Sequence, residues 1–199
     1  MKKMEAKAVE RAEKAIRRAL GSKWANIPFR MLDETDSTNL RLKEEYRAGQ
    51  LTPPFLLTAD SQTTGRGRLG RSFVSPPGTG LYMSLLSAPP PGADCGLITV
   101  LAAVAVCGAI EEMTALQPKI KWVNDLFLRG KKVCGILAET AGERVIVGIG
   151  VNLAPAPLPP ELEGTVGFLD CGDVRERLAA EIARGLLRRN AEDRAFLTA

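Results

Sequence analysis

The sequence predicts an α+β fold, a mixed but mostly antiparallel sheet with helices packed on one side. Apolar residues recur at helical spacing in several segments, and short apolar runs bounded by Gly, Pro or polar turns lie between them. In the second half of the chain, three such runs follow one another across the short turns RGKK and AGE, which is typical of antiparallel hairpins. No internal repeat is present.

The helical segments have recognisable ends. Apolar residues at helical spacing predict a first helix over residues 3–20, which Gly21 can end. Ser37 or Asp36 can cap a second helix that runs to about Ala48. The other predicted helices are an alanine- and leucine-rich segment over residues 93–116 and a basic segment from a cap at Asp173 to about Asn190.

The strands are predicted from apolar runs at residues 27–32, 55–59, 81–87, 119–123, 133–139 and 144–153. The last run, RVIVGIGVNL, is interpreted as an edge strand that could pair across a two-fold axis, so a homodimer is one expectation. The prolines of residues 154–164 lack the N–H groups that a helix or sheet requires, and this segment is expected to be irregular.

Composition excludes several classes of function. The chain has 199 residues, a net charge of +4, four scattered cysteines without a C-x-x-C pair, and no histidine. A structural zinc site and any histidine-dependent acid–base mechanism are therefore excluded. The longest apolar run, residues 97–110, is shorter than the roughly 18 to 20 apolar residues of a membrane span, and the N-terminus has no apolar signal segment. We expect a cytoplasmic protein that does not enter a membrane.

The segment TGRGRLGR at residues 64–71 concentrates arginine and glycine. Residues 65–70 match G-x-G-x-x-G, but the predicted element after them is a strand and not a helix, so a dinucleotide-binding turn is rejected. Taken alone, the segment could be a flexible basic connector. Nucleic-acid binding is disfavoured because no aromatic residue lies between these arginines and the other positive charges are dispersed along the chain.

Five motifs in this order change that interpretation: DSTN at 36–39, SQTTGRGRLGR at 61–71, KWVNDL at 121–126, GKKVCGIL at 130–137 and VGIGVNL at 147–153. Together they resemble the catalytic domain of biotin protein ligase over residues 30–153. The resemblance implies the fold of class II aminoacyl-tRNA synthetases and biotin synthetases. It also implies a reaction in which biotin and ATP form biotinyl-5′-AMP, with Mg²⁺ present, before biotin passes to a lysine of a carboxyl carrier domain.

The resemblance implies charged groups at the reacting centre. Lys132 matches the lysine beside the biotin carboxylate, and Asp125 matches a residue near the Mg²⁺. Arg66 and Arg68 match arginines of a loop that closes over the adenylate, with Gly65, Gly67 and Gly70 giving that loop its freedom. Closure would exclude water from an adenylate that hydrolyses readily. We expect residues 64–71 to be disordered without ligand, and Leu69 to pack when the loop closes.

Other residues are implied to line the pocket. Ser37, Thr38, Asn39 and Gln62 match the residues around the ureido ring of biotin, although Ser37 also suits a plain helix cap. The nucleotide is expected near Asn124 and Asn152, with Gly135, Gly148 and Gly150 letting the backbone approach the ligand. Phe73 is implied to pack on the adenylate, and simple core packing is the competing explanation. Val123 departs from the family, which usually has proline there.

The resemblance also guides the expected domains. Residues 1–26 are expected to form an N-terminal helix and residues 27–199 a catalytic domain, with neither a helix-turn-helix before it nor an SH3-like domain after it. A ligase that does not bind DNA is the leading hypothesis. Two alternatives remain: a lipoate or octanoate ligase or transferase of the same superfamily, and a non-catalytic biotin-binding module.

Overall fold

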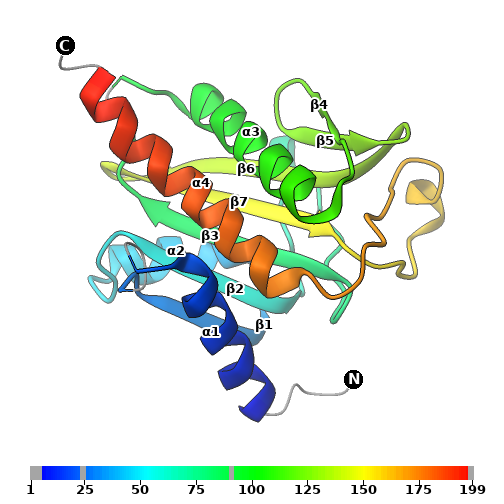
Figure 1. Cartoon of the computed structure of the whole chain (residues 1–199), viewed down its shortest axis with the longest axis horizontal. Helices are drawn as coiled ribbons and strands as arrows, with labels where there is room; N and C mark the ends of the chain where they lie inside the picture. The colour runs from blue at the N-terminus through cyan, green and yellow to red at the C-terminus, as the bar shows by residue number, and fades with distance from the viewer. Residues whose placement is uncertain (1–5, 23–25, 90–91, 197–199) are drawn as a thin grey trace.

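A computed structural model of the chain describes residues 6–22, 26–89 and 92–196, with side chains described between residues 9 and 188 (Figure 1). One seven-stranded sheet runs in the order β1-β2-β3-β7-β6-β5-β4. Only β1 and β2 pair in parallel, and every other neighbouring pair is antiparallel, which confirms the predicted mixed sheet. The strands are β1 (Phe29–Thr35), β2 (Phe55–Gln62), β3 (Gly80–Ser87), β4 (Lys119–Lys121), β5 (Asp125–Leu128), β6 (Lys131–Ala141) and β7 (Arg144–Asn152).

Three helices cover one face of the sheet, α1 (Ala6–Leu20), α3 (Cys95–Thr114) and α4 (Arg175–Phe196) (Figure 1). The expectation of helices on one side holds for these three. Helix α2 (Thr38–Arg47) packs on the opposite face, where its buried Leu42 joins Leu57 and Ile146 in a smaller apolar cluster. The reason is topological, because α2 is the connection between the two parallel strands and must cross one face of the sheet.

Helix α1 belongs to the main core. Its Ile16 and Leu20 are each only 2% exposed and join the cluster that α3, α4 and the sheet form. Helix α1 therefore contributes to the same core as residues 27–199, although the sequence predicts a division at residue 26. The first three residues of the predicted helix, 3–5, lie outside the described residues.

The structure overturns one prediction about the sheet and adds a strand. Strand β7 lies between β3 and β6 and is hydrogen-bonded on both sides, so the prediction that it is an edge strand able to pair in a dimer is wrong. Its unbroken apolar character reflects burial on both faces. The four-residue strand β5 is absent from the sequence prediction because DLFL has no clear alternation.

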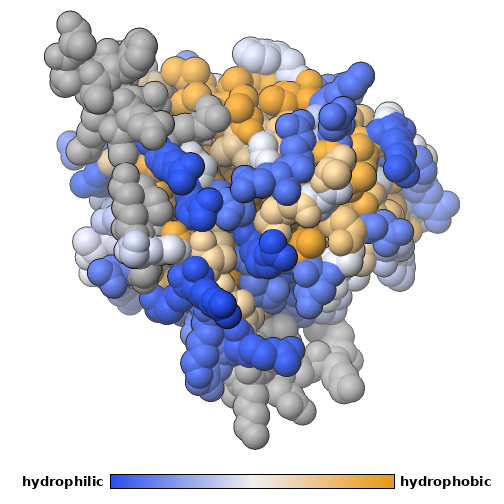
Figure 2. Space-filling model, in the orientation of Figure 1, coloured by the Kyte–Doolittle hydropathy of each residue, from blue (hydrophilic) through white to orange (hydrophobic). Residues whose placement is uncertain are grey.

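Helix α3 is, by length and composition alone, apolar enough to cross a membrane, the single such helix in the described part of the chain. In the structure it is a core helix, with Ala102, Val106 and Ile110 fully buried against the rest of the protein. Apolar surface remains over α3 on the outer side of this layer (Figure 2), where Leu97 and Val104 are exposed.

The proline-rich segment, residues 154–164, forms no strand, and the residues that follow it run beside β6. One turn of 3₁₀ helix, Pro160–Leu162, is its regular part. Beyond that turn, Lys132 N donates to Thr165 O at 2.8 Å, and Gly167 N donates to Lys132 O at 2.8 Å. These bonds fix the backbone of Lys132, the residue predicted to act at the reacting centre.

Candidate active site

A cavity of about 460 Å³ opens on the α2 face of the sheet. Its walls come from the start of α2, the loop after β2, the β4–β5 turn, and strands β6 and β7. Among the residues predicted from the sequence, the loop glycines Gly65 and Gly70 do not line this cavity, whereas these residues do: Ser37, Thr38, Asn39, Gln62, Arg66, Gly67, Arg68, Phe73, Asn124, Asp125, Lys132, Gly135, Gly148, Gly150 and Asn152. Gly65 lines an adjoining recess.

At one end of the cavity, the first turn of α2 is locked to β2. Ser37 caps the helix, as its sequence position suggested, and its Oγ accepts from Leu40 N at 3.5 Å. Gln62 Oε1 accepts from the backbone N–H of Thr38 at 2.9 Å, and Gln62 Nε2 donates to Ser75 Oγ at 2.9 Å. The orientation of the Gln62 amide is therefore determined by the protein.

The same end contains two polar residues that the sequence prediction missed, Glu139 and Ser84, and both contact Asn39. Asn39 Nδ2 donates to Glu139 Oε2 at 2.8 Å and to Leu137 O at 3.2 Å. Ser84 Oγ, on β3, lies 2.7 Å from both Asn39 Oδ1 and Thr38 Oγ1. The Asn39 amide is thus held by the protein on both sides, so it supports the pocket wall. The signal that could have found Ser84 is a serine in the middle of the apolar run LYMSLLS.

The floor of the cavity is the ring of Phe73, which packs edge-on against Tyr82 with centroids 6.4 Å apart. A Cβ at Gly150 would lie 2.4 Å from Phe73, and one at Gly135 would lie 3.0 Å from it. A Cβ at Gly148 would lie 2.3 Å from Asn39 Oδ1. These glycines make room for protein side chains in the structure, whereas the sequence interpretation assigned that room to the ligand.

A second buried group anchors the loop that carries Phe73. The Tyr82 hydroxyl donates to Pro76 O at 3.0 Å, and burial raises the pKa of Tyr82, so the hydroxyl keeps its proton. Asp60 accepts from Gly78 N at 3.2 Å and pairs with Arg175 at 2.5 Å. The sequence analysis identified none of these residues, because the groups are far apart in the chain.

The other end of the cavity is charged. Lys132 Nζ lies 2.8 Å from Asp125 Oδ1, which also accepts from Asn124 Nδ2 at 2.9 Å. Arg68 Nη1 donates to Asn124 Oδ1 at 3.3 Å and so connects the arginine-rich loop to the β4–β5 turn. Asp125 is the single acidic residue that lines the cavity, and the described residues contain no cluster of three or more metal-binding side chains.

The loop over residues 65–73 is a short hairpin. Gly67 N donates to Arg71 O at 2.7 Å, and Phe73 N donates to Gly65 O at 2.8 Å. A Cβ at Gly65 would lie 2.3 Å from Phe73 O, so this glycine lets the hairpin close. Leu69 at the tip has a φ of 57° and is 88% exposed. The expected disorder of the free loop and the packing of Leu69 on closure stay predictions.

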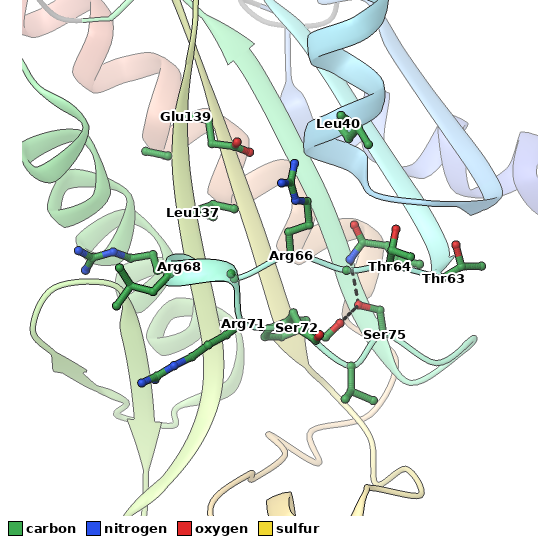
Figure 3. Close-up of a pocket in the computed structure, with 18 of the residues that line it drawn as sticks. Leu40, Thr63, Thr64, Arg66, Arg68, Arg71, Ser72, Ser75, Leu137 and Glu139 are labelled. Atoms are coloured by element: carbon green, nitrogen blue, oxygen red, sulfur yellow. Dashed lines mark hydrogen bonds between the residues drawn. The ribbon is translucent and has the colours of Figure 1, made fainter.

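The arginines of this hairpin leave it in different directions. Figure 3 shows Arg66 pointing along the recess toward Glu139, while Arg71 points away from it. The hairpin can therefore present positive charge to more than one part of a ligand.

Asn152 ties the proline-rich segment to the site. Its Nδ2 donates to Gly167 O at 3.2 Å and to Lys132 O at 3.4 Å. The side chain thus has a structural role in this state, and its predicted place beside the adenine stays a prediction.

Comparison with known proteins identifies the family. Residues 31–154 match the model of the "Biotin/lipoate A/B protein ligase family". The chain belongs to this family. The matched segment contains every residue predicted for the site.

Curated members of the biotin/lipoate ligase family support the resemblance found in the sequence. The chain is 45% identical over 116 residues to the bifunctional ligase/repressor BirA of Bacillus subtilis, which covers 54% of this chain and 36% of that protein. It is 32% identical over 174 residues to the biotin--[acetyl-CoA-carboxylase] ligase of Mycobacterium tuberculosis, covering 83% of this chain and 64% of that protein. The chain therefore spans about one third to two thirds of the length of these relatives.

Solved structures of family members confirm the predicted fold. The Aquifex aeolicus biotin protein ligase in complex with biotin and ATP has a TM-score of 0.71 at 33% identity, covering 83% of this chain and 72% of that chain. The Leishmania major biotin protein ligase in complex with biotinyl-5-AMP has a TM-score of 0.69 at 27% identity, covering 83% and 75%.

Proposed function

We propose that this chain is an ATP-dependent biotin ligase that forms biotinyl-5′-AMP and transfers biotin to a lysine of a carboxyl carrier domain. The observation that carries this proposal is the cavity with two unlike ends, one neutral and hydrogen-bonded around Thr38 and Gln62, the other cationic around Lys132. Biotin has the same two-part character, a neutral cyclic urea at one end and a carboxylate at the other. The ligands named for the related structures support the assignment.

The chemistry requires two anions to meet. A carboxylate oxygen of biotin attacks the α-phosphorus of ATP, and the bond to the leaving pyrophosphate breaks. Lys132 lies at the charged end, where its ammonium would offset this repulsion, and Arg66 and Arg68 extend the positive charge over the phosphates. In the second step, the amine of the carrier lysine attacks the acyl carbon, AMP leaves, and the amine loses a proton.

Magnesium is proposed to bind with Asp125 as its one protein carboxylate. Mg²⁺ commonly takes one or two carboxylates and completes its shell with phosphate oxygens and water. The single acid in the cavity fits that pattern, although Asp125 is paired with Lys132 in this structure. When bound, the ion would supply further positive charge next to the phosphates.

The proposed substrate follows from the polar end of the cavity. In place of the ureido ring, a lipoyl or octanoyl chain would bring no N–H or C=O group to Thr38 and Gln62, which line this end of the cavity. A module that only binds biotin could also use Lys132 to pair with the biotin carboxylate, so the adenylation experiment below decides between the two functions. We further propose that the protein acts in the cytoplasm without binding DNA.

One experiment tests the assignment. The protein is incubated with ATP labelled at the α-phosphate, with biotin, lipoate or octanoate in turn, and with or without a biotin carrier domain. We expect labelled biotinyl-AMP, labelled AMP once the carrier is added, and biotin on the carrier lysine. Adenylate formed with lipoate or octanoate but not biotin would overturn the proposed substrate. No adenylate with any acid would leave a binding module.

A further inference from the structure

One largely buried ion pair joins three segments of the chain. Arg175 Nη1, at the start of α4, lies 2.5 Å from Asp60 Oδ1 on β2, and the two side chains are 18% and 10% exposed. The same carboxylate oxygen accepts from Gly78 N at 3.2 Å. Gly78 belongs to the turn over residues 76–79, which leads from the arginine-rich hairpin into β3. Asp60 therefore connects α4 to the 76–79 turn.

The position of Arg175 is unfavourable for the helix itself. It is the first residue of α4, and the N-terminal end of a helix carries a partial positive charge that disfavours a cation. Glu176, the next residue, has the charge that suits this end. The contact with Asp60 offsets the repulsion, which indicates that Arg175 serves the 76–79 turn and not the helix.

The 76–79 turn contacts the floor of the cavity. Pro76 O accepts from the Tyr82 hydroxyl at 3.0 Å. The ring of Tyr82, which is only 1% exposed, is the support against which Phe73 packs. A shift of the turn would therefore reach the floor through Tyr82.

The same turn fixes the start of the proline-rich segment. Thr79 O accepts from Leu153 N at 3.0 Å and from Ala154 N at 2.9 Å. Further along that segment, Leu158 and Leu162 line the cavity. The floor and this wall of the cavity therefore both depend on the position of one turn.

We propose that Asp60 and Arg175 are positioning residues for adenylate formation, and that their ion pair holds the 76–79 turn so that the floor and the wall keep the reacting groups aligned. Neither residue lines the cavity. The inference rests on the proposed function, in which a carboxylate oxygen must approach the α-phosphorus of ATP opposite the leaving pyrophosphate. A misplacement of about 1 Å in such a step can cost roughly 10²-fold in rate.

The test replaces both charges by apolar side chains, Asp60→Leu with Arg175→Met. Removing one partner alone would leave a buried charge unpaired, whereas an apolar pair of similar volume often keeps the stability of the fold. Gly78 is exposed, so its N–H can bond to water in this variant. We expect a urea midpoint close to that of the wild-type chain, and faster hydrogen exchange at the backbone N–H groups of Gly78, Leu153 and Ala154.

The kinetic measurement separates the rate of the reaction from the fraction of active chains. With limiting protein, excess biotin and ATP, and no carrier domain, the first turnover of biotinyl-AMP has an amplitude that counts active chains and a rate that reports adenylate formation. We expect the apolar pair to keep the amplitude and to lose roughly ten- to hundredfold in rate. A purely structural role would lower the amplitude instead.

Two further variants are matched controls. Arg175→Lys keeps a cation for the contact with Asp60, which uses one guanidinium nitrogen, and should retain most of the wild-type rate. Glu181→Leu with Arg184→Met removes another ion pair of α4, whose side chains are 20% and 26% exposed and do not line the cavity. This second variant should leave the rate unchanged.

The route through the floor is tested with Tyr82→Phe, which keeps the ring under Phe73 but removes the bond to Pro76. Combined with the apolar pair, it should lower the rate by less than the product of the two separate losses, because both changes act through the same turn. Losses that multiply fully would show that the ion pair does not act through the 76–79 turn.

The outcomes distinguish this inference from the proposed function. If the wild-type chain forms biotinyl-AMP and the apolar pair forms it as fast, or loses no more rate than the α4 control, the role of Asp60 and Arg175 is wrong while the ligase function stands. A loss of amplitude alone leads to the same conclusion. If the wild-type chain forms no adenylate, both proposals fail.

Discussion

The two ends of the cavity differ in how completely the protein already satisfies their polar groups. At the neutral end, Thr38, Asn39 and Ser84 are at most 4% exposed and bonded to one another. At the charged end, the side chains of Lys132 and Asp125 are 30% and 22% exposed, and the hairpin above them ends in an exposed Leu69. A neutral ligand needs directional partners held in place, whereas charge acts over longer distances and tolerates groups that move into position.

The largest expected effect comes from removing charge at the reacting centre. Lys132→Ala should lower kcat/KM for biotinyl-AMP formation by roughly 10²–10³, the usual loss when one preorganised electrostatic partner is removed. The release of labelled adenylate measures it. Lys131→Ala is the matched control, because this neighbour does not line the cavity. Equal activity in the two variants would remove Lys132 from the mechanism.

A larger side chain beneath Phe73, the floor that both ends of the cavity share, should destabilise the protein. Gly150→Ala places a Cβ 2.4 Å from Phe73, and overpacking of this kind costs about 1–3 kcal/mol in the free energy of unfolding. Urea denaturation measures the loss. Adding Phe73→Leu should restore part of it. Gly164→Ala, with nothing within 4 Å of its Cβ, should have little effect, and a similar loss there would contradict the packing argument.

Salt concentration should affect ligand binding at the two ends of the cavity differently. Between roughly 0.05 and 0.5 M KCl the screening length shortens several-fold, so exposed charges attract ATP less strongly. We expect the KM for ATP to rise several-fold and the Kd for biotin to change less than about twofold, because biotin carries a single negative charge where ATP carries several, and buried neutral hydrogen bonds are little screened. Equal sensitivity of both ligands would show that the ends are not electrostatically distinct.

The smallest effect is expected at the tip of the hairpin. Leu69→Ser should change the free energy of unfolding of the free protein by no more than about 0.5 kcal/mol, as is usual for a surface substitution, so the Tm should hardly move. It should reduce the rise in Tm that a non-hydrolysable biotinyl-AMP analogue produces, because a closed loop would bury this side chain. Leu97→Ser, at an exposed position on α3, is the control. An unchanged ligand response would contradict closure over Leu69.

The candidate site was predicted with unequal success. The charged residues were found because their motifs are local, as in GKKVCGIL around Lys132. The buried support was missed, because Ser84, Glu139 and the Asp60–Arg175 pair come from segments that meet only after folding. The packing of Phe73 over Gly135 and Gly150 was missed for a related reason, and the predicted approach of these glycines to a ligand stays a prediction.

The sequence by itself determined the α+β class, most strand and helix positions, the family and the candidate residues that line the cavity, because periodicity and linked motifs are local properties of the chain. Only the tertiary structure decided that β7 is central, that α2 lies on the face opposite the other helices, and that Ser84 sits beneath Thr38 and Asn39. The order of the strands and the hydrogen bonds of Ser84 depend on contacts between distant segments. Such contacts are selected by the packing of the whole core, which no single stretch of sequence encodes.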